Sequence, residues 1–166
     1  MTNKVAVVTG SNGLTGQAIC KDLTTRGYTV VGMDIADSGN GEYAYRKCDV
    51  TDYEQITASV AAIDAEYGTI RVLVNNAGVW HGKTFFDIAP SDYDFTYGVN
   101  TRAPFFLSQE VAKRLVNAGG GGVVVNRASI VSTLGSGVTY YGGSKAPIVN
   151  LTRSVAKPLG PHGVRV

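Results

Sequence analysis

Short apolar runs alternate with amphipathic segments along the whole chain. Residues 5–8, 28–33 and 72–74 are mostly apolar, as expected for strands that are buried on both faces of a sheet. Residues 42–48 alternate in polarity, residues 123–129 begin with three valines, and 163–166 look like the opening of a sixth strand. Between these runs, apolar residues recur every three or four positions, which is typical of helices with one buried face.

Local signals refine the expected helices. The helix over residues 53–67 has Thr51 or Asp52 as its cap, and Pro90 with Ser91 opens another helix. A long helical segment follows, which Pro104 should kink or restart. Strands that alternate with helices predict an α/β fold, with a doubly wound parallel sheet in a three-layer αβα arrangement. The length of 166 residues fits one domain over residues 1–166.

Composition excludes several classes of protein. Charged residues make up 17% of the chain and the formal net charge is +2, so no basic surface for nucleic acid is expected. No apolar run is long enough to span a membrane, and Met1–Lys4 runs directly into the first strand without a signal peptide. Cys20 and Cys48 are not spaced as a metal pair, so we expect no metal site and a reducing, cytoplasmic location.

A glycine-rich turn, residues 9–16, joins the first strand to the first helix. Its pattern is GxxGxxG, and such turns let backbone approach a pyrophosphate while the helix N-terminus supplies free N–H groups. A tight turn without a ligand is the alternative. The residues expected to bind a cofactor here are Gly10, Asn12, Gly13, Leu14 and Gly16.

Asp34 ends the second strand, near the spacing at which a carboxylate meets the adenosine ribose of a dinucleotide. A carboxylate there repels a 2′-phosphate, and no arginine directly follows it to bind one. This favours NAD over NADP, although a helix cap or turn acid is the alternative role.

Several motifs occur in the order seen in one enzyme family. These are the glycine turn, Asp49, the Asn75-Asn76-Ala77-Gly78 turn, Asn100, Ser129 and the Tyr141-x-x-x-Lys145 pair. In this the whole chain resembles short-chain dehydrogenases/reductases, whose domain is Rossmann-like. The resemblance implies cofactor contacts for Asp49, Val50, Asn76, Ala77, Gly78, Tyr141 and Lys145. It also implies that Asn100, through its side chain or carbonyl, holds a water beside the catalytic lysine. The side chains of the two Asn residues can tie neighbouring strands together, whereas an Asx-turn is the alternative for each Asn alone.

Tyr141 and Lys145 lie four residues apart on the last expected helix, which places them on one face. An ammonium beside a phenol favours its ionised form, so Tyr141 is predicted to exchange a proton with an alcohol or carbonyl oxygen. Ser129 would bind the same oxygen, with Ser132 as the fallback. Tyr140 is the rival acid, but only Tyr141 has a lysine four residues later. An exposed Tyr–Lys pair without chemistry is the alternative.

The predicted function is therefore that of an NAD-dependent oxidoreductase that interconverts a secondary alcohol and a ketone. The loop over residues 79–89 places Trp80 and His81 where a substrate pocket could form, whereas Phe86 is expected to pack under the next helix. Arg127 departs from the apolar residue usual in the family. In a buried central strand it must reach a carboxylate, the solvent edge or the cofactor phosphates.

Family members continue beyond a sixth strand, so the resemblance implies a C-terminally truncated member that lacks the last strand or strands. The helices over residues 101–118 and 141–157 are the expected contact surfaces of a homo-oligomer. Two further alternatives stay open. The GxxGxxG spacing is similar to that of sugar-nucleotide epimerases, although Asn-Asn-Ala-Gly argues against them. Arg127 and the missing segment favour a non-catalytic dinucleotide binder.

Overall fold

The computed structural model describes residues 4–135 and 137–166, and the expectation for residues 1–3 lies outside this range. A six-stranded sheet in the order β3-β2-β1-β4-β5-β6 runs through the molecule, with every neighbouring pair parallel. The predicted α/β fold, a Rossmann-like doubly wound sheet, is confirmed. In chain order the elements are β1 (Val5–Thr9), α1 (Leu14–Thr25), β2 (Thr29–Asp34), β3 (Ala44–Lys47), α2 (Tyr53–Tyr67), β4 (Ile70–Asn75), η1 (Phe85–Asp87), α3 (Pro90–Tyr97), η2 (Gly98–Arg102), α4 (Ala103–Asn117), β5 (Gly122–Asn126), η3 (Ile130–Ser132), α5 (Thr139–Leu159), η4 (Gly160–His162) and β6 (Val164–Arg165).

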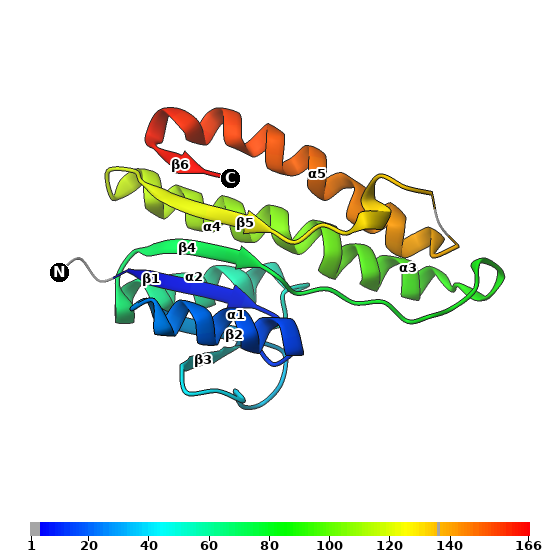
Figure 1. The fold of residues 1–166 in the computed structure, drawn as a ribbon, viewed down its shortest axis with the longest axis horizontal. Helices are drawn as coiled ribbons and strands as arrows, with labels where there is room; N and C mark the ends of the chain where they lie inside the picture. Colours follow the sequence, from blue (N-terminus) through cyan, green and yellow to red (C-terminus); the bar gives the residue numbers. More distant parts are fainter. Residues whose placement is uncertain (1–3, 136) are drawn as a thin grey trace.

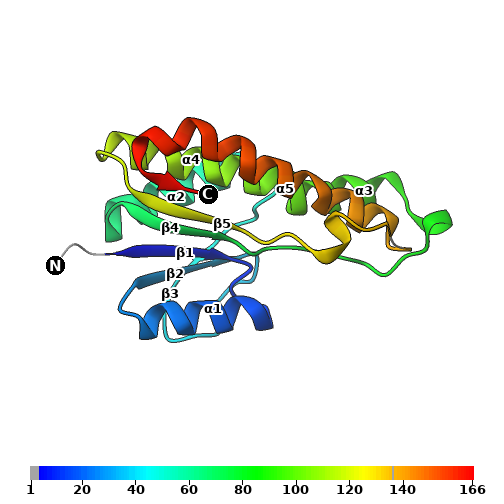
Figure 2. The same cartoon turned by 45° about the horizontal axis from the view of Figure 1, so that its top comes forward.

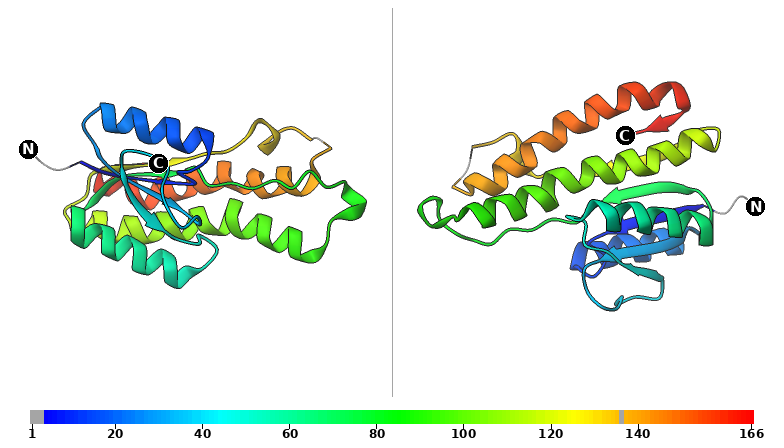
Figure 3. Two further views of the ribbon diagram at one scale, coloured as in Figure 1. Left: turned by 90° about the horizontal axis from the view of Figure 1, so that it is seen from below. Right: turned by 180° about the vertical axis from the view of Figure 1, so that it is seen from behind.

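The helices cover the two faces of the sheet unequally. Helix α1 lies on one face, while α2, α4 and α5 lie on the other (Figures 2 and 3). All strands point in the same direction, and the segments after β4 and β5 project beyond their carboxyl ends toward α3 and the start of α5 (Figure 1). Loops that follow several different strands therefore meet at this edge, where open α/β sheets bind ligands.

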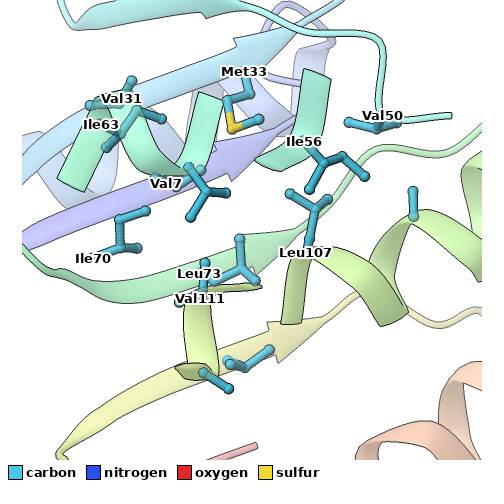
Figure 4. Packing of buried hydrophobic residues seen from close by; sticks show 14 of the residues in the cluster. Val7, Val31, Met33, Val50, Ile56, Ile63, Ile70, Leu73, Leu107 and Val111 are labelled. Carbon is cyan, nitrogen blue, oxygen red and sulfur yellow. The ribbon is translucent and has the colours of Figure 1, made fainter. Parts of the chain in front are cut away.

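The sheet divides the core into two clusters, one on each face, because its central strands are apolar on both sides. On the α1 face, Ala6 and Val8 pack with Cys20. On the opposite face, Val7, Val31 and Leu73 meet α2 and α4 through residues such as Ile56 and Leu107 (Figure 4). Successive residues of β1 thus point into different clusters, because side chains alternate along a strand.

Two helix boundaries differ from the expectation. Helix α5 begins at Thr139 rather than Tyr141 and ends at Leu159, so Pro147 lies in its interior instead of its first turns. Pro147 has no N–H to donate within the helix. The helix nevertheless stays continuous, because tertiary packing of its buried residues Ile148 and Leu159 stabilises it. The helix expected over 101–118 is α4, Ala103–Asn117, preceded by a π-helical turn over Gly98–Arg102. Pro104 in the first turn of α4 accounts for this irregularity, because it offers no N–H to the preceding turn.

Two further expectations were wrong. The fifth strand ends at Asn126 rather than Ser129, because its partner β4 ends at Asn75; only the Arg127 N–H still reaches the Asn75 carbonyl, at 3.0 Å. Phe86 does not pack under the next helix, since 92% of its surface is exposed.

Of the two candidate caps for α2, Asp52 is the one that acts, because its carboxylate accepts the Glu54 and Gln55 N–H groups.

Candidate functional site

A cleft of about 360 Å³ opens at the carboxyl ends of β1, β2 and β4. It has the size of a small-molecule site, and its walls come from five separate loops. Most of the residues predicted to bind a cofactor line it, namely Gly10, Gly13, Leu14, Gly16, Asp34, Asp49, Val50, Asn76, Ala77 and Gly78. Asn12, Tyr141 and Lys145 are not among its lining residues.

The glycine turn has two glycines that the fold requires and one that it does not. Gly10 has a φ of +64°, and a Cβ there would lie 2.9 Å from the Ala77 Cα. A Cβ on Gly16 would overlap the Gly10 carbonyl and lie 2.8 Å from the Ser11 Cα. A Cβ on Gly13 would meet only the Gly10 carbonyl, at 3.5 Å, and Gly13 caps α1 without any side-chain hydrogen bond. The exposed Gly13 therefore leaves the α1 N-terminus open toward the cleft.

Asn12 holds the glycine turn to the segment after β2. Its main-chain N–H donates to the Asp34 carboxylate at 3.0 Å, and its side-chain Nδ2 donates to the Ser38 carbonyl at 2.8 Å. The Asn40 N–H in turn donates to Asn12 Oδ1 at 3.1 Å. The Asp34 carboxylate also accepts the Ile35 N–H at 2.8 Å, so it is fixed at the cleft wall with lone pairs remaining. The side chain of Asn12 is thus committed to the loop rather than to the cleft.

Asp49 and Val50 follow β3 at the opposite side of the cleft. Asp49 Oδ1 accepts hydrogen bonds from the Thr51 N–H at 2.9 Å and the Thr51 hydroxyl at 2.7 Å. Val50 is 8% exposed and forms part of the core edge. Both residues therefore have fixed positions at the cleft wall.

The two asparagines of the 75–78 turn tie β4 to both neighbouring strands, as expected. Asn75 Nδ2 donates to Asn126 Oδ1 at 2.8 Å, and Asn76 Nδ2 donates to the Thr9 carbonyl at 2.9 Å. The buried Thr9 hydroxyl accepts the N–H groups of Asn76 at 3.1 Å and Ala77 at 3.0 Å. This role of Thr9 was not predicted; its place directly before the glycine turn was the available signal.

Lys145 and Asn100 converge on Gly78. A Cβ added to Gly78 would lie 3.2 Å from Lys145 Nζ and 3.3 Å from Asn100 Oδ1. Lys145 is 3% exposed, and its ammonium donates to the Arg127 carbonyl at 3.2 Å. Burial, and secondarily the charge of Arg127, lower the pKa of Lys145 to about 8. The Lys145 side chain is therefore directed into the protein at Gly78 rather than into solvent.

The side chain of Asn100 is fully engaged. Its Oδ1 accepts the Val79 N–H at 2.9 Å, and its Nδ2 donates to the Val79 carbonyl at 3.0 Å and to Ser144 Oγ at 2.9 Å. Ser144 Oγ donates in turn to the Tyr141 carbonyl at 2.7 Å. The π-helical turn, the loop after Gly78 and the Tyr141–Lys145 turn are thereby joined, a function of Ser144 that the motif alone did not reveal.

Tyr140 and Tyr141 have different surroundings. Tyr140 is 4% exposed, and its hydroxyl accepts the His81 N–H at 3.0 Å. Tyr141 is half-buried, and its ring lies 6.4 Å from that of Trp80, centre to centre. Since Trp80 is 56% exposed, the two rings border open space beyond the sheet edge. Tyr140 thus supports the loop, whereas Tyr141 faces a place where a ligand has access.

Ser129 precedes the short η3 helix, which packs on the start of α5. A Cβ on Gly142 would lie 3.4 Å from the Val131 carbonyl, so the segments that carry Ser129 and Tyr141 are neighbours. The fallback Ser132 uses its hydroxyl to accept the Ser129 N–H at 3.0 Å. The Ser132 hydroxyl is thus engaged with the Ser129 backbone, and the role of Ser129 toward a substrate stays a prediction.

Cysteine and acidic side chains form no second centre within the described part of the chain. Residues 4–135 and 137–166 contain no group of three or more His, Cys, Asp or Glu side chains that could hold a metal. Cys20 and Cys48 are buried free thiols, and burial raises the pKa of Cys20 to about 11. Over the same residues, no helix has the length and apolar character needed to cross a bilayer.

Comparison with known sequences and structures agrees with this arrangement. The family described as short chain dehydrogenase matches residues 4–166. D-threitol dehydrogenase of Mycolicibacterium smegmatis is 35% identical over all of this chain and 68% of its own length. Galactitol 2-dehydrogenase of Agrobacterium fabrum is 33% identical, again over 100% and 68% of the two chains.

Solved structures show the same fold. The structure titled 4-hydroxyisoleucine dehydrogenase complexed with NADH has a TM-score of 0.92 and 27% identity, covering 99% of this chain and 73% of the other. Aldohexose dehydrogenase of Thermoplasma acidophilum, in ligand-free form, has a TM-score of 0.90 and 29% identity, covering 98% and 64%.

Proposed function

The chain belongs to the short-chain dehydrogenase family, and on that premise we propose that it is an NAD-dependent oxidoreductase acting on a secondary alcohol and its ketone. The observation that carries this proposal is the convergence of buried Lys145 and Asn100 on Gly78, one helical turn from Tyr141. Gly78 also lines the cleft that begins at the glycine turn. This arrangement supports the proposal that a proton-transfer group acts beside a dinucleotide site.

The cleft residues fit a nicotinamide dinucleotide on structural grounds. Gly13 leaves the N-terminus of α1 without a side-chain cap. Packing would tolerate a Cβ at this position, so a glycine is not needed there for the fold. Helix N-termini of this kind attract phosphate. When bound, NAD supplies or accepts the hydride. The residues of this chain provide the position and the proton.

Tyr141 is the proposed general acid and base. Lys145 follows Tyr141 by one helical turn, and an ammonium placed near a phenol favours transfer of the phenol proton. With a pKa of about 8, Lys145 is mainly charged at neutral pH and loses its charge as the pH rises above 8. Ser129 would donate a hydrogen bond to the reacting oxygen as negative charge develops there.

A pair of tyrosine variants gives the direct test. The parent chain is mixed with NAD and a panel of polyols and secondary alcohols, and the absorbance of reduced cofactor is followed. The names of the threitol and galactitol relatives motivate the polyols in this panel. Turnover that is lost in Tyr141→Phe supports the proposal. NAD binding without turnover of any panel member would instead support the non-catalytic binder that Arg127 suggests.

We further propose a preference for NAD over NADP through Asp34. Its carboxylate is fixed at the cleft wall by the Asn12 and Ile35 N–H groups and would repel a 2′-phosphate. Titrations with NADH and NADPH should show weaker NADPH binding in the parent. Asp34→Ala should narrow the difference, whereas Asp37→Ala, which removes an exposed acid outside the cleft, should not. A parent that binds both cofactors equally would contradict this assignment.

A homo-oligomer formed through α4 and α5 completes the proposal. The two helices line an apolar groove of about 790 Å³, which includes Phe105, Val116 and Val155, and Phe105 is 44% exposed. Exposed apolar area of this kind favours association. Sedimentation should show a dimer or larger species in the parent and a monomer in Phe105→Asp; a monomeric parent would refute the assignment.

A further inference from the structure

Arg127 extends its side chain into the cofactor cleft. The residue follows β5 directly, is exposed, and lines the same cleft as Gly10 and Gly13. Its Nη1 donates to Asn76 Oδ1 at 3.1 Å. Arg127 forms no ion pair with a carboxylate among residues 4–135 and 137–166.

Asn76 directs this guanidinium toward the glycine turn. The same amide group that accepts from Arg127 donates through Nδ2 to the Thr9 carbonyl at 2.9 Å and to the Gly10 carbonyl at 3.2 Å. Arg127 is therefore linked to Gly10 through a single side chain. A guanidinium has five N–H donors in one plane, so this contact leaves most of them free on a side chain that lines the cleft.

The charges of the side chains that line the cleft indicate that the Arg127 guanidinium could bind an anion. The other charged side chains that line it are those of Asp34 and Asp49, which would repel an anion. The N-terminus of α1 contributes about half a positive charge, less than a pyrophosphate diester with two negative charges needs. Lys145 is buried and bonded to the Arg127 carbonyl. Arg127 is thus the full positive charge that the cleft lining presents.

We propose that Arg127 is a pyrophosphate-binding residue, which holds the dinucleotide from the β5 side while the N-terminus of α1 holds it from the β1 side. This inference rests on the proposed function, because it requires that the cleft bind a dinucleotide. It assigns to Arg127 the anion contact that neither the glycine turn nor the two acids provide. A guanidinium suits this role because it binds phosphate oxygens in a bidentate manner.

The test compares ligands that differ in their phosphates. Adenosine, ADP-ribose and NADH are titrated by calorimetry into the full chain and into Arg127→Met. Arg153→Met is the matched control, because it removes the same charge from an exposed position of α5 outside the cleft. Arg127→Lys keeps the charge but loses the planar fork. Thermal melts establish that each variant is folded.

Arg127→Met should weaken ADP-ribose and NADH binding by about 10- to 100-fold, as expected for a charge-assisted hydrogen bond. Adenosine binding should change by less than about twofold, and Arg127→Lys should lie between the two for ADP-ribose. Two outcomes would overturn this inference while leaving the proposed function intact. One is unchanged ADP-ribose binding in Arg127→Met, and the other is tighter binding, which would mean that the arginine side chain blocks the cleft. A parent that binds none of the three ligands would overturn the proposed function as well.

Discussion

Replacing Thr9 by valine tests whether one buried hydroxyl organises the floor of the cleft. Thr9 is 1% exposed, and its Oγ1 accepts the N–H groups of Asn76 and Ala77 while donating to the Val74 carbonyl at 3.4 Å. Valine has the same shape but cannot form these bonds. The substitution therefore isolates hydrogen bonding from packing.

The size of the effect follows from which groups lose their partners. The Asn76 N–H keeps a second acceptor, the Val74 carbonyl at 3.0 Å, so the Ala77 N–H loses most. Leaving one such group unpaired costs about 1–3 kcal/mol, and weakening a shared bond adds up to about 1 kcal/mol. We expect Thr9→Val to lower the free energy of unfolding by about 2–3 kcal/mol, out of about 5–15 kcal/mol for a domain.

Urea denaturation followed by circular dichroism measures this difference, with Thr9→Ser as the control. Serine keeps the hydroxyl and loses one buried methyl group, which costs about 1 kcal/mol. Because Ala77 and Gly78 line the cleft, ADP-ribose affinity should also fall more in Thr9→Val than in Thr9→Ser. If Thr9→Val is as stable as Thr9→Ser, the hydroxyl does not hold the 75–78 turn and this reasoning is refuted.

Three further outcomes are expected. Tyr141→Phe should slow turnover by about 10²- to 10⁴-fold, as for loss of a general acid. Tyr140→Phe should keep its turnover and lose only stability, because it removes the hydroxyl that accepts the His81 N–H. Equal losses of turnover in the two variants would contradict the assignment of Tyr141. Gly16→Ala should fail to fold stably because its Cβ overlaps the preceding turn, whereas Gly13→Ala should fold normally, as thermal melts would show, and bind ADP-ribose more weakly in calorimetry. Finally, the pKa of Lys145 is lowered from 10.5 to about 8, so from about pH 8 to about pH 9 the unfolded chain binds more protons at this lysine and stability should rise with pH; above about pH 9 the raised pKa of the Cys20 thiol acts in the opposite direction. Urea melts at successive pH values should show this rise in the parent and a smaller rise in Lys145→Met.

Features set by neighbouring residues could be predicted from the sequence. The strand–turn–helix at residues 5–16 and the four-residue spacing of Tyr141 and Lys145 are local patterns, and the structure contains both. The order of apolar runs and amphipathic segments was likewise enough to give the parallel sheet. Each of these depends on periodicity or on backbone freedom at single glycines, which can be read along the chain.

Features set by distant contacts could not be predicted. The length of the fifth strand depends on where β4 ends, and the exposure of Phe86 depends on the path of the loop that carries it. The direction of the Arg127 side chain depends on Asn76, a residue 51 positions away in sequence. The engagement of Asn100 by Val79 and Ser144 is of the same kind, since it joins three segments.

The hydrogen bonds of Asn12 imply that the phosphate-facing turn and the loop after β2 respond to a ligand together. Asn12 contacts Asp34, Ser38 and Asn40 at once, so neither segment opens without breaking the same set of bonds. A ligand as small as adenosine, bound only near Asp34, should therefore slow amide hydrogen exchange at Asn40 and in the glycine turn alike. Immobilising one end of the dinucleotide would in this way preorganise the chain for the other end.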